Sequence, residues 1–154
     1  MSKKPQGRGK TLVVDARATV EACAGWNSRL AARRITKFLD KHLEAAGLSI
    51  AQFGLMAQVA AASDDTLGAL AERTGLDQST LSRNLRGLEM AGLVEIAIAE
   101  KDQRRRAVWL TEHGARRLEA AIPLWRQAHL ALGKVLDPQL ARRLADATRD
   151  LETD

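Results

Sequence analysis

A short set of polar and basic side chains follows Asp77 at helical spacing. On a helix, the members of this set project from the side opposite an apolar stripe: Ser79, Ser82, Arg83 and Arg86. Arginine can fork onto the edge of guanine, and hydroxyls can contact bases or phosphates. Such a helix fits the major groove of duplex DNA, although the same pattern also occurs on a merely solvated helix face.

A second basic set lies between two segments that alternate in the manner of strands. Val94–Ile98 predicts a half-buried strand, and Ala107–Leu110 predicts its return strand. The tip between them carries Lys101, Asp102, Arg104, Arg105 and Arg106. A charged tip can simply keep a hairpin soluble. A narrower role is that Asp102 holds the Arg104 guanidinium and aims it at a narrow minor groove, while the next two arginines contact phosphates.

Two short helices joined by a tight turn must position the first set. Thr66 precedes the run Leu67–Ala71 and can cap a helix, which Gly75 ends. Asp77 can cap the second helix, and Gly92 stops it. The buried stripe of this second helix consists of Leu81, Leu85 and Leu88. Two helices with a short glycine-containing turn predict a helix-turn-helix, and the hairpin that follows predicts its wing.

Long helical patterns flank this central part. The first begins near Thr19 and ends at Gly47, and Ser49 can then cap the next helix. Another follows Gly114 and keeps apolar residues at helical spacing for longer than one small core requires. Asp137–Pro138 predicts the start of a final helix. Apolar helix surface in excess of a chain's own needs indicates isologous dimerisation.

Composition agrees with a single domain that binds a polyanion. The chain has 154 residues, of which 45% are hydrophobic, enough for one core. Its 24 Lys and Arg against 19 Asp and Glu give a formal net charge of +5. No apolar run approaches a membrane span, and the first ten residues lack the apolar core of a secretion signal. We therefore expect a cytoplasmic protein without a membrane partner.

Several segments together resemble the MarR family of bacterial transcription regulators over nearly the whole chain. They are the block LAERTGLDQSTLSRNLRGLEMAGLV from Leu70, the wing residues Asp102-Gln103-Arg104, the junction Leu110-Thr111-Glu112-His113-Gly114, and the helix pair that ends in Gly47-Leu48-Ser49. The resemblance implies a mainly α fold with a small β-hairpin wing and one winged helix-turn-helix per subunit. It also implies a homodimer formed by the N- and C-terminal helices, and regulation by a small molecule or an oxidant.

The resemblance also implies a domain plan and a set of contacts. We expect a disordered basic tail over 1–17 and one domain over 18–154, with the winged helix-turn-helix at about 49–111 and dimerisation helices at about 18–46 and 112–152. The expected partner is double-stranded DNA with a pseudo-palindromic operator, and repression is expected because the family mostly blocks promoters. The expected DNA contacts are Gln78, Ser79, Thr80, Ser82, Arg83, Arg86, Lys101, Asp102, Arg104, Arg105 and Arg106.

The family pattern places an effector pocket between the dimer helices and the DNA-binding lobe. The side chains that are candidates to line it are Trp26, Phe38, His42, Phe53 and Met56. Each of them fits a plain core position as well, because aromatic residues and methionine at helical spacing usually pack in a core. The effector is expected to be a small aromatic or other small molecule.

Cys23 is the single cysteine, so no disulfide can form within the chain. One-cysteine members of the family sense organic peroxides with a thiol near the N-terminus, and those sensors hydrogen-bond the sulfur with tyrosine hydroxyls. This chain contains no tyrosine. We therefore expect a buried, inert cysteine on the first helix, with redox sensing through Cys23 as the alternative.

Two other classes of function are disfavoured by the sequence. An enzyme would need a catalytic constellation, but the histidines are scattered, and no nucleophile elbow, phosphate loop or paired metal-ligand motif is present. We expect no enzyme activity, no cofactor and no metal site. A winged helix used for protein contact would expose apolar residues on its second helix and lack a basic wing, which the arginines here argue against.

Overall fold

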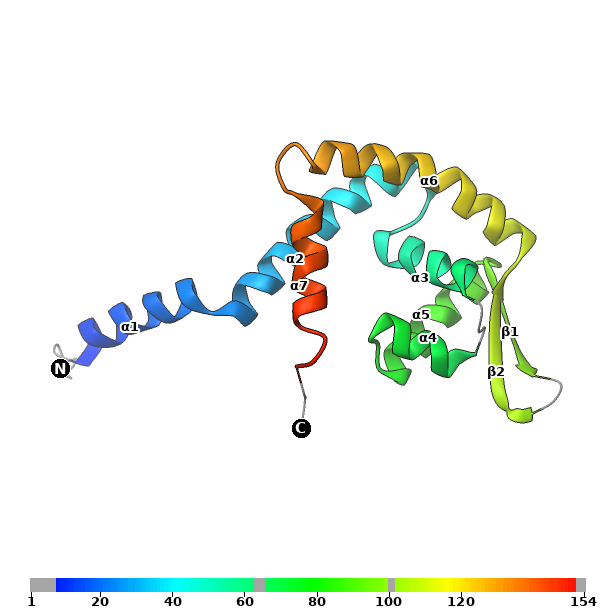
Figure 1. Ribbon diagram of the computed structural model, residues 1–154, viewed down its shortest axis with the longest axis horizontal. Helices are drawn as coiled ribbons and strands as arrows, with labels where there is room; N and C mark the ends of the chain where they lie inside the picture. Colours follow the sequence, from blue (N-terminus) through cyan, green and yellow to red (C-terminus); the bar gives the residue numbers. More distant parts are fainter. Residues whose placement is uncertain (1–7, 63–65, 100–101, 152–154) are drawn as a thin grey trace, which may run out of the picture. The chain divides into compact units, whose positions relative to one another are not determined.

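The computed structural model describes residues 8–62, 66–99 and 102–151 and, within these ranges, all side chains except those of residues 8, 99 and 102–105. The elements are α1 (Arg8–Ala22), α2 (Ala24–Leu43), the 3-10 helix η1 (Glu44–Ala46), α3 (Ile50–Ala61), α4 (Leu67–Thr74), α5 (Gln78–Met90), β1 (Val94–Ala99), β2 (Asp102–Leu110), α6 (Glu112–Leu132) and α7 (Pro138–Ala147) (Figure 1). The mainly α fold with a small β-hairpin is thus confirmed. The chain divides into two compact units between Phe38 and Leu39.

The first unit contains α1 and most of α2. The expectation of a disordered tail up to residue 17 differs from the structure, in which residues 8–17 belong to α1. From Lys10 to Ala22 the sequence has neither glycine nor proline, so nothing in it interrupts a helix. Residues 1–7 lie outside the described residues. Every described side chain of α1 is exposed, including Leu12 and Val14.

Cys23 interrupts the helical pattern that was expected to run unbroken to Gly47. It separates α1 from α2, and its Sγ accepts a hydrogen bond from the backbone N–H of Trp26 at 3.4 Å. The expectation of a buried cysteine is wrong for the single chain, because Cys23 is exposed. A residue at a helix break does not take part in the apolar stripe of either helix, so helical spacing alone gave no reliable guide to its burial.

The second unit shows the predicted helix ends. Ser49 and Gln52 form a reciprocal capping box at the start of α3, with the Gln52 N–H donating to Ser49 Oγ at 3.1 Å. Thr66 Oγ1 accepts from the N–H of Ala69 at 3.3 Å and caps α4. Gly75 ends α4 with φ of 64°, a left-handed conformation that glycine adopts at no steric cost.

The core of this unit gathers around α3, which contacts α4, α6 and β2 (Figure 1). The predicted stripe of α5 is buried and points into this core. The buried members of the core are Leu43, Leu48, Phe53, Leu55, Met56, Val59, Leu70, Leu81, Leu85, Leu88, Leu93, Val94, Val108, Leu118 and Ala121. The apolar face of α5 is therefore fixed against the domain, and its polar face is left to solvent.

β1 and β2 pair antiparallel as the predicted hairpin, from Val94 opposite Leu110 to Ile98 opposite Arg106. The register then shifts between Ile98 and Ala99, and β2 begins at Asp102. Its start at Asp102 was not predicted, because the basic residues of the tip show no alternation of apolar and polar side chains. An isolated bridge between Thr66 and Ala107 ties the start of α4 to the outer edge of β2.

A compact junction joins the end of α5 to the start of α6. Thr111 N donates to Leu93 O at 3.1 Å, and Thr111 Oγ1 donates to Gly92 O at 2.6 Å. The same hydroxyl oxygen accepts from Gly114 N at 2.9 Å and so caps α6. A Cβ on Gly114 would lie 1.9 Å from Leu93 O. Only glycine allows the two backbones to approach this closely.

Candidate nucleic-acid interface

The first turn of α5 is organised by the carboxylate of Asp77. Its Oδ1 accepts from the N–H of Thr80 at 2.8 Å and from the hydroxyl of Ser79 at 2.6 Å. Its Oδ2 accepts from the hydroxyl of Thr80 at 2.8 Å. These bonds, first that from the Ser79 hydroxyl and then those from Thr80, hold the pKa of Asp77 well below its ordinary value. The hydroxyl protons of both residues are therefore engaged by hydrogen bonds within the chain.

The depressed pKa of Asp77 predicts a pH-dependent stability. The carboxylate is favoured by the folded state, so its contribution is complete above the unfolded pKa of 3.8 and is lost as the pH falls below it. We expect the difference in Tm between the wild type and Asp77→Ala to stay constant from about pH 7 to 5 and to shrink below about pH 4. Thermal unfolding followed by circular dichroism at each pH measures it.

The matched control for this prediction is Asp77→Asn, whose amide oxygen can still cap the helix but does not titrate. Its Tm relative to Asp77→Ala is expected to show no such change at low pH. A difference between the wild type and Asp77→Ala that persists unchanged to pH 3 would contradict the assignment.

The predicted contact residues of α5 lie on its open side. Gln78, Ser79, Ser82, Arg83 and Arg86 are exposed, whereas Thr80 is half-buried. The two arginines form no ion pair or hydrogen bond with any described residue. Their guanidinium groups are therefore available to an external partner.

Arg83 borders a cavity of about 440 Å³ between α5 and the start of α3. The other polar side chains on this cavity include Ser49, Gln52 and Asn84. Arg86 does not border it. By the helical period, Arg83 is directed more nearly opposite the buried leucine stripe than Arg86 is. Arg83 is thus well placed to enter the major groove of a DNA duplex that lies against the open side of α5.

The predicted contacts of the wing lie largely outside the described residues. Lys101 is outside the described backbone, and the side chains of Asp102, Arg104 and Arg105 are outside the described side chains, so the Asp102–Arg104 pair stays a prediction. Arg106 is described and exposed, and it stands opposite Ile98 on the hairpin. The basic character of the tip itself is a property of the sequence.

The effector candidates are divided between the two units. Trp26 and Phe38 belong to the first, where the guanidinium of Arg33 lies 5.8 Å from the centre of the Trp26 ring. In the second unit, Phe53 and Met56 are core residues, and Met56 has no exposed surface. His42 is half-buried.

An aromatic group that the sequence analysis did not single out lies beside Phe53. Trp125 of α6 stacks on Phe53 with ring centres 6.1 Å apart, and His129 lies 4.1 Å from the ring of Trp125. His129 Nδ1 is also hydrogen-bonded to Trp125 O at 3.0 Å. The spacing of four residues between Trp125 and His129 was visible in the sequence, but their contact with α3 was not.

Among the described residues, no group of three or more His, Cys, Asp or Glu is arranged to hold a metal ion. No single helix in the described ranges is long and apolar enough to cross a membrane. Ala24–Ala46 and Ile50–Ala61 meet that test only when they are taken together as a bent pair.

A helix-turn-helix that presents a polar, basic helix beside a two-stranded hairpin defines the chain as a winged helix-turn-helix protein. The family model described as the MarR family matches residues 46–105. The Mycobacterium tuberculosis transcriptional regulator MosR, solved in complex with DNA, is 31% identical, with a TM-score of 0.74 over 81% of this chain and 92% of that one. The chain belongs to the MarR family of DNA-binding transcription regulators, which are not enzymes.

More distant structures share the fold. MarR of E. coli in its apo form is 24% identical, with a TM-score of 0.63 over 84% of this chain and 97% of that one. PcaV of Streptomyces coelicolor, solved with its natural ligand, is 20% identical, with a TM-score of 0.72 over 84% of this chain and 96% of that one. A comparison with curated proteins gives no match.

Proposed function

We propose that the protein is a homodimeric repressor that binds a pseudo-palindromic DNA site and is released by a small-molecule effector. One observation carries the DNA-reading part: α5 turns exposed Ser79, Ser82 and Arg83 away from a fully packed leucine stripe. A helix held in this way can enter a major groove and offer the Ser82 hydroxyl, the Ser79 hydroxyl oxygen as an acceptor, and a guanidinium to base edges. The solved complex of MosR with DNA supports this assignment.

The dimer is supported by apolar surface on the C-terminal helices. α7 has no buried residue, although Leu140 and Leu144 lie one turn apart on it. Leu130 and Val135, before α7, are 74% and 87% exposed. A monomer rarely leaves this many large apolar side chains of neighbouring segments in water. A second copy of the chain would cover it by the isologous contact that closed dimers use.

The PcaV structure with its natural ligand supports a ligand-responsive mode for this fold. Because Met56 is fully buried, it can touch a ligand only if the core opens, whereas His42 has exposed surface. We therefore place His42 ahead of the buried Met56 as an effector contact.

Redox regulation through Cys23 is the second candidate. The observation that favours it is the exposure of the thiol, since an exposed thiol can meet an oxidant and a buried one cannot. The chain has no tyrosine to hydrogen-bond the sulfur. Small-molecule release is therefore the first candidate, and redox regulation the second.

Selection of bound fragments from a random duplex pool tests the proposal. We expect a pseudo-palindrome whose half-sites lie about one helical turn apart, because two symmetry-related copies of α5 must enter successive major grooves. Sedimentation at micromolar concentration is expected to show a dimer. A monomer that binds one half-site with full affinity would overturn the symmetric part, and recovery of no preferred sequence would overturn the whole.

Truncation after Lys134 provides a separate check of the dimer. It removes α7 and the exposed apolar residues from Val135 onward, so we expect a monomer that no longer binds the palindrome tightly. A quadruple variant that keeps the apolar residues of α7 is the control. It replaces four charged residues with glutamine: Arg142, Arg143, Asp146 and Arg149. It is expected to remain a dimer.

A further inference from the structure

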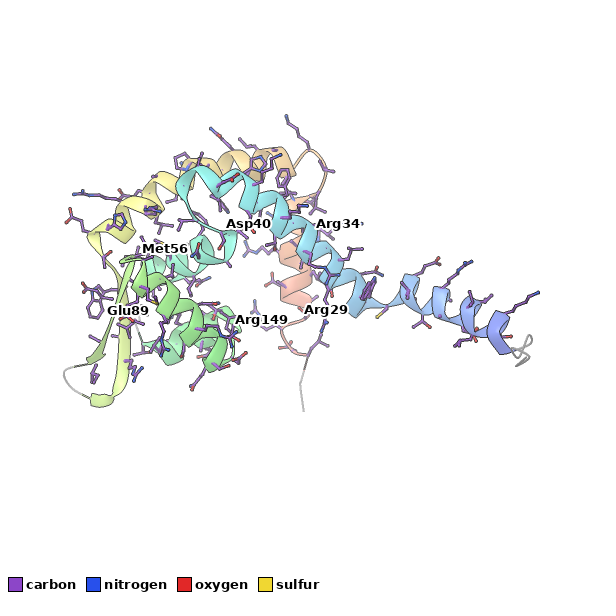
Figure 2. All side chains as sticks on the ribbon, turned by 180° about the vertical axis from the view of Figure 1, so that it is seen from behind. Arg29, Arg34, Asp40, Met56, Glu89 and Arg149 are labelled. Carbon is purple, nitrogen blue, oxygen red and sulfur yellow. The ribbon has the colours of Figure 1, made fainter. Side chains whose placement is uncertain are left out.

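A cavity of about 220 Å³ lies between α5 and the hairpin. Its walls include Ser82, Arg86 and Glu89 from α5 and Ile96, Ile98 and Arg106 from the hairpin. Figure 2 labels Glu89 on α5, beside the hairpin. Arg86 and Arg106 are exposed, and neither forms an ion pair or hydrogen bond with another described residue. Two unpaired guanidinium groups thus stand on opposite walls of one cavity.

The geometry of B-DNA indicates which part of a duplex could lie between a helix and a hairpin. Neighbouring major and minor grooves of B-DNA, about 12 Å and 6 Å wide, are separated by a single sugar-phosphate strand. A protein that places a helix in the major groove and a hairpin in the adjacent minor groove must straddle this strand. In such a protein, the space between the helix and the hairpin is the path of the strand.

The chemistry of the walls matches a phosphodiester strand. Guanidinium groups form charge-assisted hydrogen bonds with phosphate oxygens, and Arg86 and Arg106 can supply them from both sides. Ile96 is half-buried and Ile98 is 59% exposed, so the hairpin wall offers apolar surface to deoxyribose. The apolar surface of these two side chains is smaller than a protein partner would need.

The two arginines of α5 face different sides of the helix. Arg86 has Ser82 and Glu89 as its neighbours at four and three residues and borders the hairpin cavity with them. Arg83 borders the cavity next to α3 instead. By the sequence pattern alone, both arginines are candidates for guanine, but the structure gives them different surroundings.

We propose that the cavity between α5 and the hairpin seats one phosphodiester strand of the operator, with Arg86 and Arg106 as its phosphate ligands. Arg86 then contributes to affinity at all sequences and does not read a base. This inference rests on the proposed DNA-binding function and assigns a role within it. Glu89 lies in the same cavity and opposes the phosphate charge, so it lowers the affinity.

The test uses the full-length protein and the duplex recovered by selection, with single phosphates replaced in turn by uncharged methylphosphonates. Binding is measured by fluorescence anisotropy at fixed salt. For the wild type, one linkage between the major-groove half-site and the adjacent minor groove is expected to cost about tenfold in affinity, as loss of a charge-assisted hydrogen bond does. Arg86→Ala and Arg106→Ala are each expected to lose most of that sensitivity.

Salt dependence and charge give two further readouts. Each alanine variant should reduce the slope of log affinity against log salt by about 0.9, the value for one phosphate contact. Glu89→Gln should bind about two- to fivefold more tightly, the range of a surface charge interaction. Arg126→Ala is the matched control, because Arg126 is exposed on α6 and has no partner among the described residues.

The outcomes separate the inference from the function on which it rests. The Arg86→Ala protein could keep full sensitivity to the methylphosphonate and relax its preference at one base pair instead. That result would overturn the phosphate assignment and leave the proposed DNA-binding function standing. Weaker binding by Glu89→Gln would also count against it. Wild-type protein that selects no duplex would overturn both.

Discussion

Gly114→Ala is expected to lower the free energy of unfolding by about 1–3 kcal/mol, the usual cost of overpacking, or by more. The added Cβ would lie 1.9 Å from the carbonyl oxygen of Leu93. Because this neighbour is backbone, no side-chain rotation can relieve the clash. The start of α6 must move away, and the bonds of Thr111 to Gly92 and Leu93 weaken with it. Urea denaturation of the two proteins measures the difference.

Gly68→Ala is the matched control for this prediction. Gly68 lies inside α4, and a Cβ there would meet nothing within 4 Å. The same substitution should therefore be neutral or stabilise the protein by up to about 1 kcal/mol, through helix propensity alone. If Gly114→Ala is as stable as Gly68→Ala, the close approach between α6 and Leu93 is not present in the protein.

Arg83→Ala is expected to cost about 1–3 kcal/mol of binding free energy at the preferred site and to relax the preference at one base pair. The reason is the direction of Arg83, which is exposed and more nearly opposite the buried stripe of α5 than Arg86 is. If the Arg83 guanidinium forks onto guanine, its removal costs the complex both of these hydrogen bonds. Anisotropy titrations against the preferred duplex and its single-base variants, at one salt concentration, measure the effect.

The same titrations with Arg126→Ala control for the loss of one positive charge. That variant should match the wild type at every duplex. A loss for Arg83→Ala that is equal at all sequences would identify Arg83 as a phosphate contact. Unchanged binding would remove Arg83 from the interface.

The sequence by itself determined the local structure of the winged helix-turn-helix. Thr66, Asp77 and Ser49 cap their helices as predicted, because a cap bonds to a backbone N–H only a few residues away. Gly75 adopts the left-handed conformation that its position after a helix indicates. The leucine stripe of α5 is buried because its spacing follows the helical period. These features depend on neighbours in the chain, which a sequence displays.

The sequence also determined the polar composition of the open face of α5, but not the roles within it. Arg83 and Arg86 are three residues apart and look equivalent in the pattern. Only the tertiary structure shows that they border different cavities, one shared with the hairpin and the other shared with the start of α3. The division of labour that we propose for them therefore comes from the tertiary structure.

Other features were decided only when distant segments met. The sequence marked Gly114 only as the end of a junction before a long helical pattern, and its need for glycine arises from Leu93, twenty-one positions earlier. Trp125 stacks on Phe53 across two helices, which no local spacing could show. The break at Cys23 comes two residues before Gly25, a glycine that the expected unbroken helix passed over. Local patterns fix caps, turns and faces, whereas close approaches and cavities depend on how those faces come together in space.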